Sequence, residues 1–242
     1  MGQLNEKLRP INPSLIEIQN KVRSDFNWSL ESDINSAKKL EKFVRKSPIK
    51  KHDVNELKIK LSKAENVVIL GAAVEPEDVL EIDYNCVFVA ADGSIGVFDE
   101  LPKKDAKDAW NRLALIVSDA DGGDAILKAA QKGIPFALHA HGDNIEEWGK
   151  LLPHLITNNN EILLTHQCSE EIEGMHNPGG FTDGDRAACV VFSCGIPKSK
   201  IILLGFSSES IGRWTGVTNP IIKLRKLKWM DGVLKILFGV EH

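Results

Sequence analysis

The sequence from Ala114 to Asp124 reads ALIVSDADGGD, and it decides both the fold and the site. Its first four residues are apolar, which is typical of a strand buried on both faces of a parallel sheet. Asp119 and Asp121 follow where that strand gives way to a helix. In open α/β sheets, ligands bind at this carboxyl edge of the strands. The stretch therefore predicts an α/β fold with two carboxylates at its binding edge.

These two carboxylates need a compensating charge. At a separation of about 4 Å they repel each other by roughly 4 kcal/mol at an effective dielectric constant of about 20. A proton or a cation relieves this repulsion, and magnesium and calcium prefer oxygen ligands. The calcium-loop pattern fails because Gly123 stands where a third ligand belongs and no glutamate closes the loop. Magnesium held by a few carboxylates and by substrate phosphates fits better.

The composition is that of an ordinary globular protein. The 242 residues are 43% hydrophobic and 26% charged, which suits one main domain with an appendage. A net charge of -4 argues against a general nucleic-acid binder. The sequence shows neither a signal peptide nor a membrane-spanning stretch, so we expect a cytoplasmic protein without a membrane partner. Without a CxxC pair, buried free thiols are expected at Cys86, Cys168, Cys189 and Cys194.

The chain divides into three predicted regions. Residues 1–64 carry apolar residues at helical spacing, interrupted at Pro48, and predict a helical cap on the main domain. Residues 65–210 alternate between strand and helix patterns and form the main α/β domain, and residues 211–242 predict a helical segment that packs on the core. The lysines between Lys38 and Lys63 predict a solvated face, with phosphate binding as the alternative.

Six apolar runs predict the strands of the main domain, at residues 67–70, 86–90, 114–117, 136–138, 162–164 and 201–204. Helical patterns begin near Asp124, Asp143 and Gly184. The first of them ends with Gly133 and Pro135, a typical helix terminus. Right-handed crossovers between parallel strands place helices on both faces of a sheet. We therefore predict an α/β fold with a doubly wound, mostly parallel sheet of about six strands, an N-terminal helical cap and a C-terminal helix.

Acidic residues follow three of these strands in succession: Asp92, then Asp119 with Asp121, then Asp143. One aspartate at a strand end is usually a helix cap or a turn former. Three such strand ends bring their charges into one crevice, where unpaired charges destabilise the fold unless a metal or ligand compensates them. The pattern therefore predicts a shared metal-binding crevice.

His139 and His141 alternate along one strand, so both can face the same side. They could form a zinc pair with His166 or Cys168. The interpretation that we favour is one partly buried histidine and one that contacts a phosphate or a base. The turn that follows supports it, because Gly142 lets backbone and substrate approach closely.

A second polar cluster spans residues 177–186 and reads NPGGFTDGDR. Its glycines precede a helix whose first amides and dipole suit phosphate oxygens, although Thr182 or Asp183 could simply cap that helix. Arg186, in the first turn, is badly placed for the helix dipole, and a contact with a phosphate would explain it. The sequence holds neither a Walker A pattern nor a GxGxxG fingerprint, which argues against P-loop and Rossmann oxidoreductase functions.

The run from Lys223 to Lys228 reads KLRKLK and carries four cations in six residues. A solvated helix face is the simplest explanation. The alternative is that one or two of these side chains reach a polyphosphate.

Four strings, taken in order, resemble the archaeal-type 6-hydroxymethyl-7,8-dihydropterin pyrophosphokinase family, whose catalytic domain is similar to thiamin pyrophosphokinase. They are ADGS at 91–94, SDADG at 118–122, HAHGDN at 139–144 and GFTDGDRA at 180–187. The last two are fairly specific, and the resemblance runs from about Asn66 to the tail. It implies an ATP-dependent, magnesium-dependent transfer of diphosphate to the pterin hydroxymethyl group, in folate or methanopterin-type cofactor biosynthesis.

Diphosphoryl transfer needs positioning and charge neutralisation more than covalent help from the protein. The predicted catalytic set is Asp92, Asp119, Asp121 and Asp143. We expect the last three to hold the magnesium that bridges the ATP phosphates. Asp92 would lie near the acceptor hydroxyl as base, pterin-orienting group or further metal ligand, with Ser94 beside the pterin. The residues expected to contact ATP are His139, His141, Asn144, Thr182, Asp183, Asp185 and Arg186.

Two other functions stay open at this point. A DxD pair at a strand end also serves metal-dependent sugar-nucleotide transferases, and a non-catalytic nucleotide-binding module would keep the same crevice. The expected partners are small molecules, ATP and a pterin, without nucleic acid. A homodimer is compatible with the sequence.

Overall fold

The computed structural model describes residues 6–142 and 144–239 of the chain. Over these residues seven strands form one parallel sheet, in the order β1-β6-β5-β4-β3-β2-β7. The strands are β1 (Lys50–Lys51), β2 (Asn66–Leu70), β3 (Cys86–Ala91), β4 (Leu113–Ser118), β5 (Phe136–Ala140), β6 (Glu161–His166) and β7 (Ile201–Leu204). The predicted doubly wound α/β class is confirmed, with one strand more than expected. The three-region division stays a prediction.

β1 is the strand that the sequence pattern does not predict. Its two lysines are exposed and carry no apolar periodicity. The strand exists through backbone pairing alone, with Lys50 opposite Glu161 and Lys51 opposite Ile162 at the edge of the sheet. The region 1–64 therefore supplies an edge strand as well as the expected helices.

Helices flank the strands throughout the described residues. None of them combines the length and the hydropathy needed to cross a membrane. They are α1 (Ser14–Phe26), α2 (Leu30–Lys46), α3 (Val54–Lys63), α4 (Pro76–Leu80), α5 (Lys103–Arg112), α6 (Gly123–Gln131), α7 (Ile145–Thr157), α8 (Asp183–Ser193) and α9 (Pro220–Phe238), with 3-10 helices η1 (Asp92–Asp99) and η2 (Lys198–Lys200).

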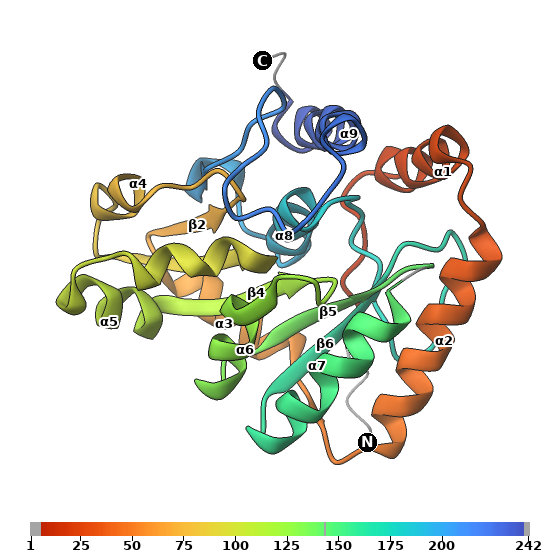
Figure 1. The fold of residues 1–242 in the computed structure, drawn as a ribbon, viewed down its shortest axis with the longest axis horizontal. Coiled ribbons are helices and arrows are strands. Elements are labelled where there is room, and N and C mark those ends of the chain that lie inside the picture. The colour runs from red at the N-terminus through yellow and green to blue at the C-terminus, as the bar shows by residue number, and fades with distance from the viewer. Residues whose placement is uncertain (1–5, 143, 240–242) are drawn as a thin grey trace.

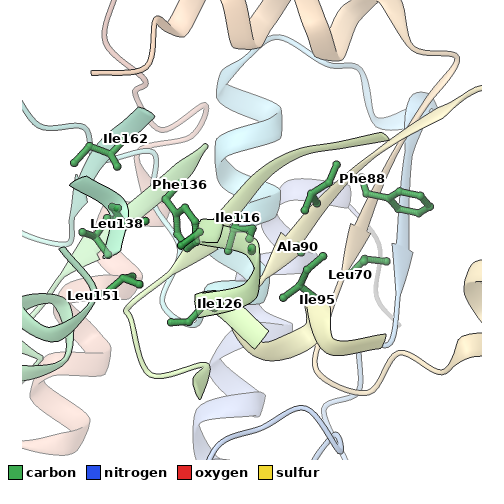
Figure 2. Close-up of a cluster of buried hydrophobic side chains, with 14 of the residues drawn as sticks. Leu70, Phe88, Ala90, Ile95, Ile116, Ile126, Phe136, Leu138, Leu151 and Ile162 are labelled. Carbon is green, nitrogen blue, oxygen red and sulfur yellow. The ribbon is translucent and has the colours of Figure 1, made fainter. Parts of the chain in front are cut away.

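Both faces of the sheet are covered (Figure 1). Helices α2, α5, α6 and α7 pack on one face, and α1, α3, α8 and α9 pack on the other. Strand residues alternate between the two cores: Leu70 and Ile116 join the first, whereas Ile69 and Val117 join the second. Figure 2 shows side chains of the first core lying side by side across the sheet. Burial on both faces explains why the strands read as continuous apolar runs.

The order of the strands explains where a cleft forms. From β2 to β6 the chain adds strands in one direction, and it then returns through α8 to place β7 beside β2. Ligand crevices of open α/β sheets lie at the carboxyl ends of strands, where the strand order reverses. The segments that follow β2, β3, β4, β5, β6 and β7 all contribute residues to one cleft at this edge.

Replacing Ile116 by alanine tests the central position of β4. Ile116 is fully buried in the first core, so Ile116→Ala should lower the free energy of unfolding by about 2–5 kcal/mol through lost transfer energy and a residual cavity. The matched control is Ile59→Ala on α3, where the side chain is 52% exposed, and its expected effect is within about 0.5 kcal/mol. Denaturant-induced unfolding measures both. Equal effects of the two substitutions would contradict the assignment.

Candidate active site

Three aspartates meet at the carboxyl ends of β3 and β4. Asp92 is the first residue of η1, directly after β3, and Asp119 and Asp121 follow β4. Each contributes a carboxylate oxygen to a group whose members lie within 4.8 Å of one another. The structure thus brings these three strand-end residues together. Asp143, the fourth aspartate of the predicted set, lies outside the described residues.

The backbone around the aspartates allows this close approach. Asp92 and Ala120 adopt left-handed conformations, with φ of 46° and 80°, which residues other than glycine seldom do. A Cβ on Gly122 would lie 2.5 Å from Asp92 Oδ2, so only glycine leaves room there. Ser118 Oγ donates to Asp92 Oδ1 at 2.5 Å and accepts from the amide of Ala120 at 2.9 Å. Ser118 and Gly122 lie in the SDADG string, but their residue types alone do not indicate these roles.

Crowding raises the pKa of most carboxyls in the cleft. Burial and then the charge of Asp119 hold the pKa of Asp92 well above its usual range. Desolvation and the same neighbouring charge raise the pKa of Asp121 to about 6. They also raise the pKa of Asp183, in the first turn of α8, to about 8. Near neutral pH the cluster therefore resists carrying all of its negative charges.

Asp119 differs because His141 lies beside it. Burial opposes ionisation, but the hydrogen bond and the charge of His141 outweigh it and lower the pKa of Asp119. Asp119 Oδ2 lies 3.3 Å from His141 Nε2, whereas Oδ1 is buried without a hydrogen-bond partner among the described residues. A buried carboxylate oxygen without a donor is costly, and a cation would satisfy it. The three carboxylates therefore fit a hard divalent ion.

The two histidines of the HAHGDN string take different places. His141 lines the cleft. His139 is fully buried, with its ring nitrogens 3.1 Å from Thr165 Oγ1 and 3.4 Å from Gln167 Oε1, and burial holds its pKa well below the usual range. Neither histidine belongs to a group of metal-ligating side chains in the described part of the chain. The structure thus has one buried and one cleft-lining histidine, and it does not group them as zinc ligands among the described residues. Contact of His141 with a phosphate or a base stays a prediction.

Asn144 and Ser94 support the cleft from behind. Asn144 Nδ2 donates to the carbonyl oxygens of Asp119, at 2.9 Å, and His139, at 2.7 Å. Its Oδ1 accepts from the amide of His141 at 3.0 Å, so one side chain joins the ends of β4 and β5. Ser94 Oγ donates to a β2 carbonyl at 3.0 Å. Neither side chain is among the described residues that line the cleft, and their roles in ATP and pterin binding stay predictions.

The start of α8 forms one wall of the cleft. Thr182 caps the helix, and Asp185 closes the capping box by accepting from the amides of Phe181, at 2.6 Å, and Thr182, at 2.7 Å. Buried Arg186 donates to Asp183 Oδ1 at 3.0 Å and to the carbonyl of Phe181 at 2.9 Å. Among the described residues, Thr182 and Asp183 line the cleft, whereas Asp185 and Arg186 do not. Contact of these four residues with ATP stays a prediction.

The cleft has other lining residues that the motifs do not indicate. It spans about 1130 Å³ when its open mouth is counted. Trp28, between α1 and α2, lines it, and so do Phe206 and Trp214 after β7. These aromatic residues stand alone in the sequence, outside any recognisable string, so only the fold reveals that they share a cleft.

A buried ion pair ties the N-terminal helices to the site. Arg23 Nε of α1 lies 3.1 Å from Asp33 Oδ2 of α2, and 9% and 3% of the two side chains are exposed. Asp33 also accepts from the amide of Gly142, at 2.8 Å, and from Gln167 Nε2, at 3.0 Å. It therefore fixes the segments after β5 and β6. The available sequence signal was a charge on an apolar helix stripe, since Asp33 follows Leu30 by three residues.

Comparison with known proteins agrees with the motif strings. No protein-family model matches the chain. The 6-hydroxymethyl-7,8-dihydropterin pyrophosphokinase of Methanocaldococcus jannaschii is 29% identical over 235 residues, which cover 90% of this chain and 92% of the relative. Proteins of the same name from Pyrococcus furiosus and Methanothermobacter thermautotrophicus are 27% and 26% identical, covering 91% and 87% of this chain and 87% and 91% of the relatives.

The chain is a homologue of the archaeal 6-hydroxymethyl-7,8-dihydropterin pyrophosphokinases. The family resemblance drawn from the four strings is thus confirmed. It also extends further than expected. Because about nine tenths of the chain aligns, the similarity to these pyrophosphokinases includes much of the region before Asn66.

His166 lies at the end of β6 and was considered above as an alternative zinc ligand. The pH dependence of unfolding tests whether burial holds this histidine neutral in the pyrophosphokinase homologue. Burial lowers the pKa of His166 from 6.5 to about 4. The unfolded chain therefore binds more protons than the folded chain between those pH values, and His166 lowers stability as the pH falls through this window. In His166→Gln, the loss of unfolding free energy between pH 7 and pH 4.5 should be smaller than in the parent by about 2 kcal/mol.

The control is His154→Gln at the exposed end of α7, which should leave the pH dependence unchanged. Urea unfolding at a series of pH values measures all three proteins. An identical pH dependence in His166→Gln and the parent would show that His166 is not held neutral by burial.

Proposed function

We propose that this protein catalyses magnesium-dependent transfer of diphosphate from ATP to the hydroxymethyl group of 6-hydroxymethyl-7,8-dihydropterin, releasing AMP and the pterin diphosphate. The observation that carries the proposal is the group formed by Asp92, Asp119 and Asp121 within 4.8 Å, on the cleft of a homologue of enzymes that bear this name. On the basis of the same resemblance, we assign the reaction to folate or methanopterin-type cofactor biosynthesis and the protein to the cytoplasm.

The donor set supports magnesium as the metal. Asp92, Asp119 and Asp121 offer only carboxylate oxygens, and the buried Oδ1 of Asp119 has no partner in the described chain. Such hard oxygen ligands suit magnesium, which also keeps waters and substrate phosphates in its shell. Bound there, the ion would neutralise charge on the ATP phosphates. Asp143 stays a predicted further ligand.

The chain's own residues would position the substrates and move one proton. The acceptor oxygen must form a bond to the β-phosphorus of ATP as the bond to the oxygen that leaves with AMP breaks. The acceptor proton then needs a base. Asp92 is proposed for this role or for orienting the acceptor, because Ser118 fixes its Oδ1 and its carboxyl belongs to the group of three that could hold the metal. His141, which contacts Asp119, and Thr182 at the start of α8 are proposed to contact ATP.

A product assay tests the reaction. The protein is incubated with ATP, magnesium and 6-hydroxymethyl-7,8-dihydropterin, and mass spectrometry should detect AMP and pterin diphosphate in equal amounts. Asp121→Asn should reduce turnover by at least about 100-fold, because it removes ligand charge with little change of shape. The matched control is Asp124→Asn, which removes the same charge from an exposed position in the first turn of α6 and should keep activity.

Other products would contradict the proposal. Release of a nucleoside diphosphate from a sugar nucleotide would indicate a transferase of the rival class. Binding of ATP without turnover by the parent protein would indicate a nucleotide-binding module.

Metal removal supplies an independent test of the carboxylate site. Magnesium that binds the folded chain should raise the free energy of unfolding, by about 2.7 kcal/mol when its concentration is 100 times the dissociation constant. EDTA should abolish the gain. Asp121→Asn should lose most of it, and Asp124→Asn should retain it. Thermal unfolding with and without magnesium measures the effect, and an equal gain in both variants would remove Asp121 from the site.

A further inference from the structure

The basic run Lys223–Lys228 divides into two faces of α9. Lys223 and Lys226 are half-buried and line the cleft, and so do Leu227 and Met230 on the same side of the helix. Residues three and four apart share a helix face, which explains this grouping. Lys228 is exposed and is not among the cleft-lining residues of the described chain. The run is therefore not one uniform solvated face.

Contacts with α1 hold α9 in this orientation, and the two helices lie side by side in Figure 1. Arg225 Nε donates to Asp25 Oδ2 at 2.9 Å, and Trp229 Nε1 donates to the same oxygen at 2.9 Å. Asp25 thus anchors the face of α9 that turns away from the cleft. Lys226 Nζ lies 5.1 Å from the ring centre of Trp28, another cleft residue. Lys223 and Lys226 are consequently directed to the cleft by the packing of the helix.

The position of Lys223 in its helix needs an explanation. It lies in the first turns of α9, where the helix dipole disfavours a cation, and no acidic residue of the first turn compensates it. Its charge instead acts on Asp121 and Asp183, two other residues of the cleft, where it offsets a small part of the rise in their pKa values. A negatively charged ligand between α9 and the aspartates would stabilise the positive charges of both lysines, because phosphate oxygens accept hydrogen bonds from ammonium groups.

We propose that Lys223 and Lys226 bind the polyphosphate chain of the nucleoside triphosphate, on the side of the cleft opposite the Asp92–Asp119–Asp121 group. The carboxylates would hold a divalent ion that neutralises part of the phosphate charge, and the two ammonium groups would balance part of the charge that remains. This assignment rests on the proposed function, because it presupposes ATP in the cleft. It gives the C-terminal helix a part in substrate binding that none of the four motif strings indicates.

Equilibrium binding without a pterin tests the assignment. Lys223→Gln and Lys226→Gln remove one charge each at similar length, and the matched control is Lys228→Gln on the same helix. Isothermal titration with magnesium–ATP should show dissociation constants raised about 10-fold in the first two variants and unchanged in the third. Binding of AMP should change less than 3-fold in all variants, because AMP lacks the β- and γ-phosphates. Inorganic tripolyphosphate should compete more weakly in both cleft variants.

Two results would overturn the assignment. One is magnesium–ATP binding by Lys223→Gln and Lys226→Gln that matches the parent or Lys228→Gln. The other is an equal loss of AMP and ATP affinity, which would place the lysines near the nucleoside or make them purely structural. Turnover of pterin by the parent protein is measured separately by mass spectrometry. If the parent protein does not turn over the pterin but binds ATP through the two lysines, the proposed pyrophosphokinase function is wrong and the polyphosphate site is retained.

Discussion

Repulsion among carboxylates at the edge of a parallel sheet is the constraint around which this molecule is arranged. Asp92, Asp119 and Asp121 stand within 4.8 Å because two adjacent strands end beside each other. The fold could have avoided this by placing neutral residues at the strand ends. Instead, three local features keep the charges together. The backbone at Asp92 is left-handed, Ser118 connects the two strand ends through its hydrogen bond to Asp92, and Gly122 leaves room for the Asp92 carboxylate. Such an arrangement is stable only with protons or a cation in it.

The sheet explains where the carboxylates lie, but a second layer of buried polar contacts explains how they are held. Asn144 joins the ends of β4 and β5, and Asp33 joins the segments after β5 and β6 to the N-terminal helices. Each of these side chains is hydrogen-bonded and nearly inaccessible, as buried polar groups must be. The N-terminal region is therefore continuous with the site, which agrees with the span of the similarity to the archaeal homologues.

Local patterns of the sequence predict part of this structure, whereas contacts between residues far apart in the chain leave no such pattern. The six long strands and the convergence of Asp92, Asp119 and Asp121 could be predicted, because apolar runs and strand-end carboxylates are local patterns with one consequence in a parallel sheet. β1 could not, since two exposed lysines paired only through their backbone leave no side-chain pattern. The orientation of Lys223 and Lys226 could not be predicted either. It depends on Asp25, which is about 200 residues distant in the chain and gives no sign of its partner.

The motif strings themselves mix two kinds of residue, and this bears on what a family resemblance can establish. HAHGDN contains the cleft-lining His141 but also His139 and Asn144, which lie behind the cleft wall. FTDGDRA likewise contains the buried pair Asp185 and Arg186. A match to such strings therefore reports the buried scaffold around the cleft as much as the side chains that line it. The other walls of the cleft are formed by Trp28, Phe206, Trp214 and α9, which lie outside the four strings. A match to the strings therefore carries no information about the ligand that these walls accept, because specificity comes from the surfaces that a ligand touches.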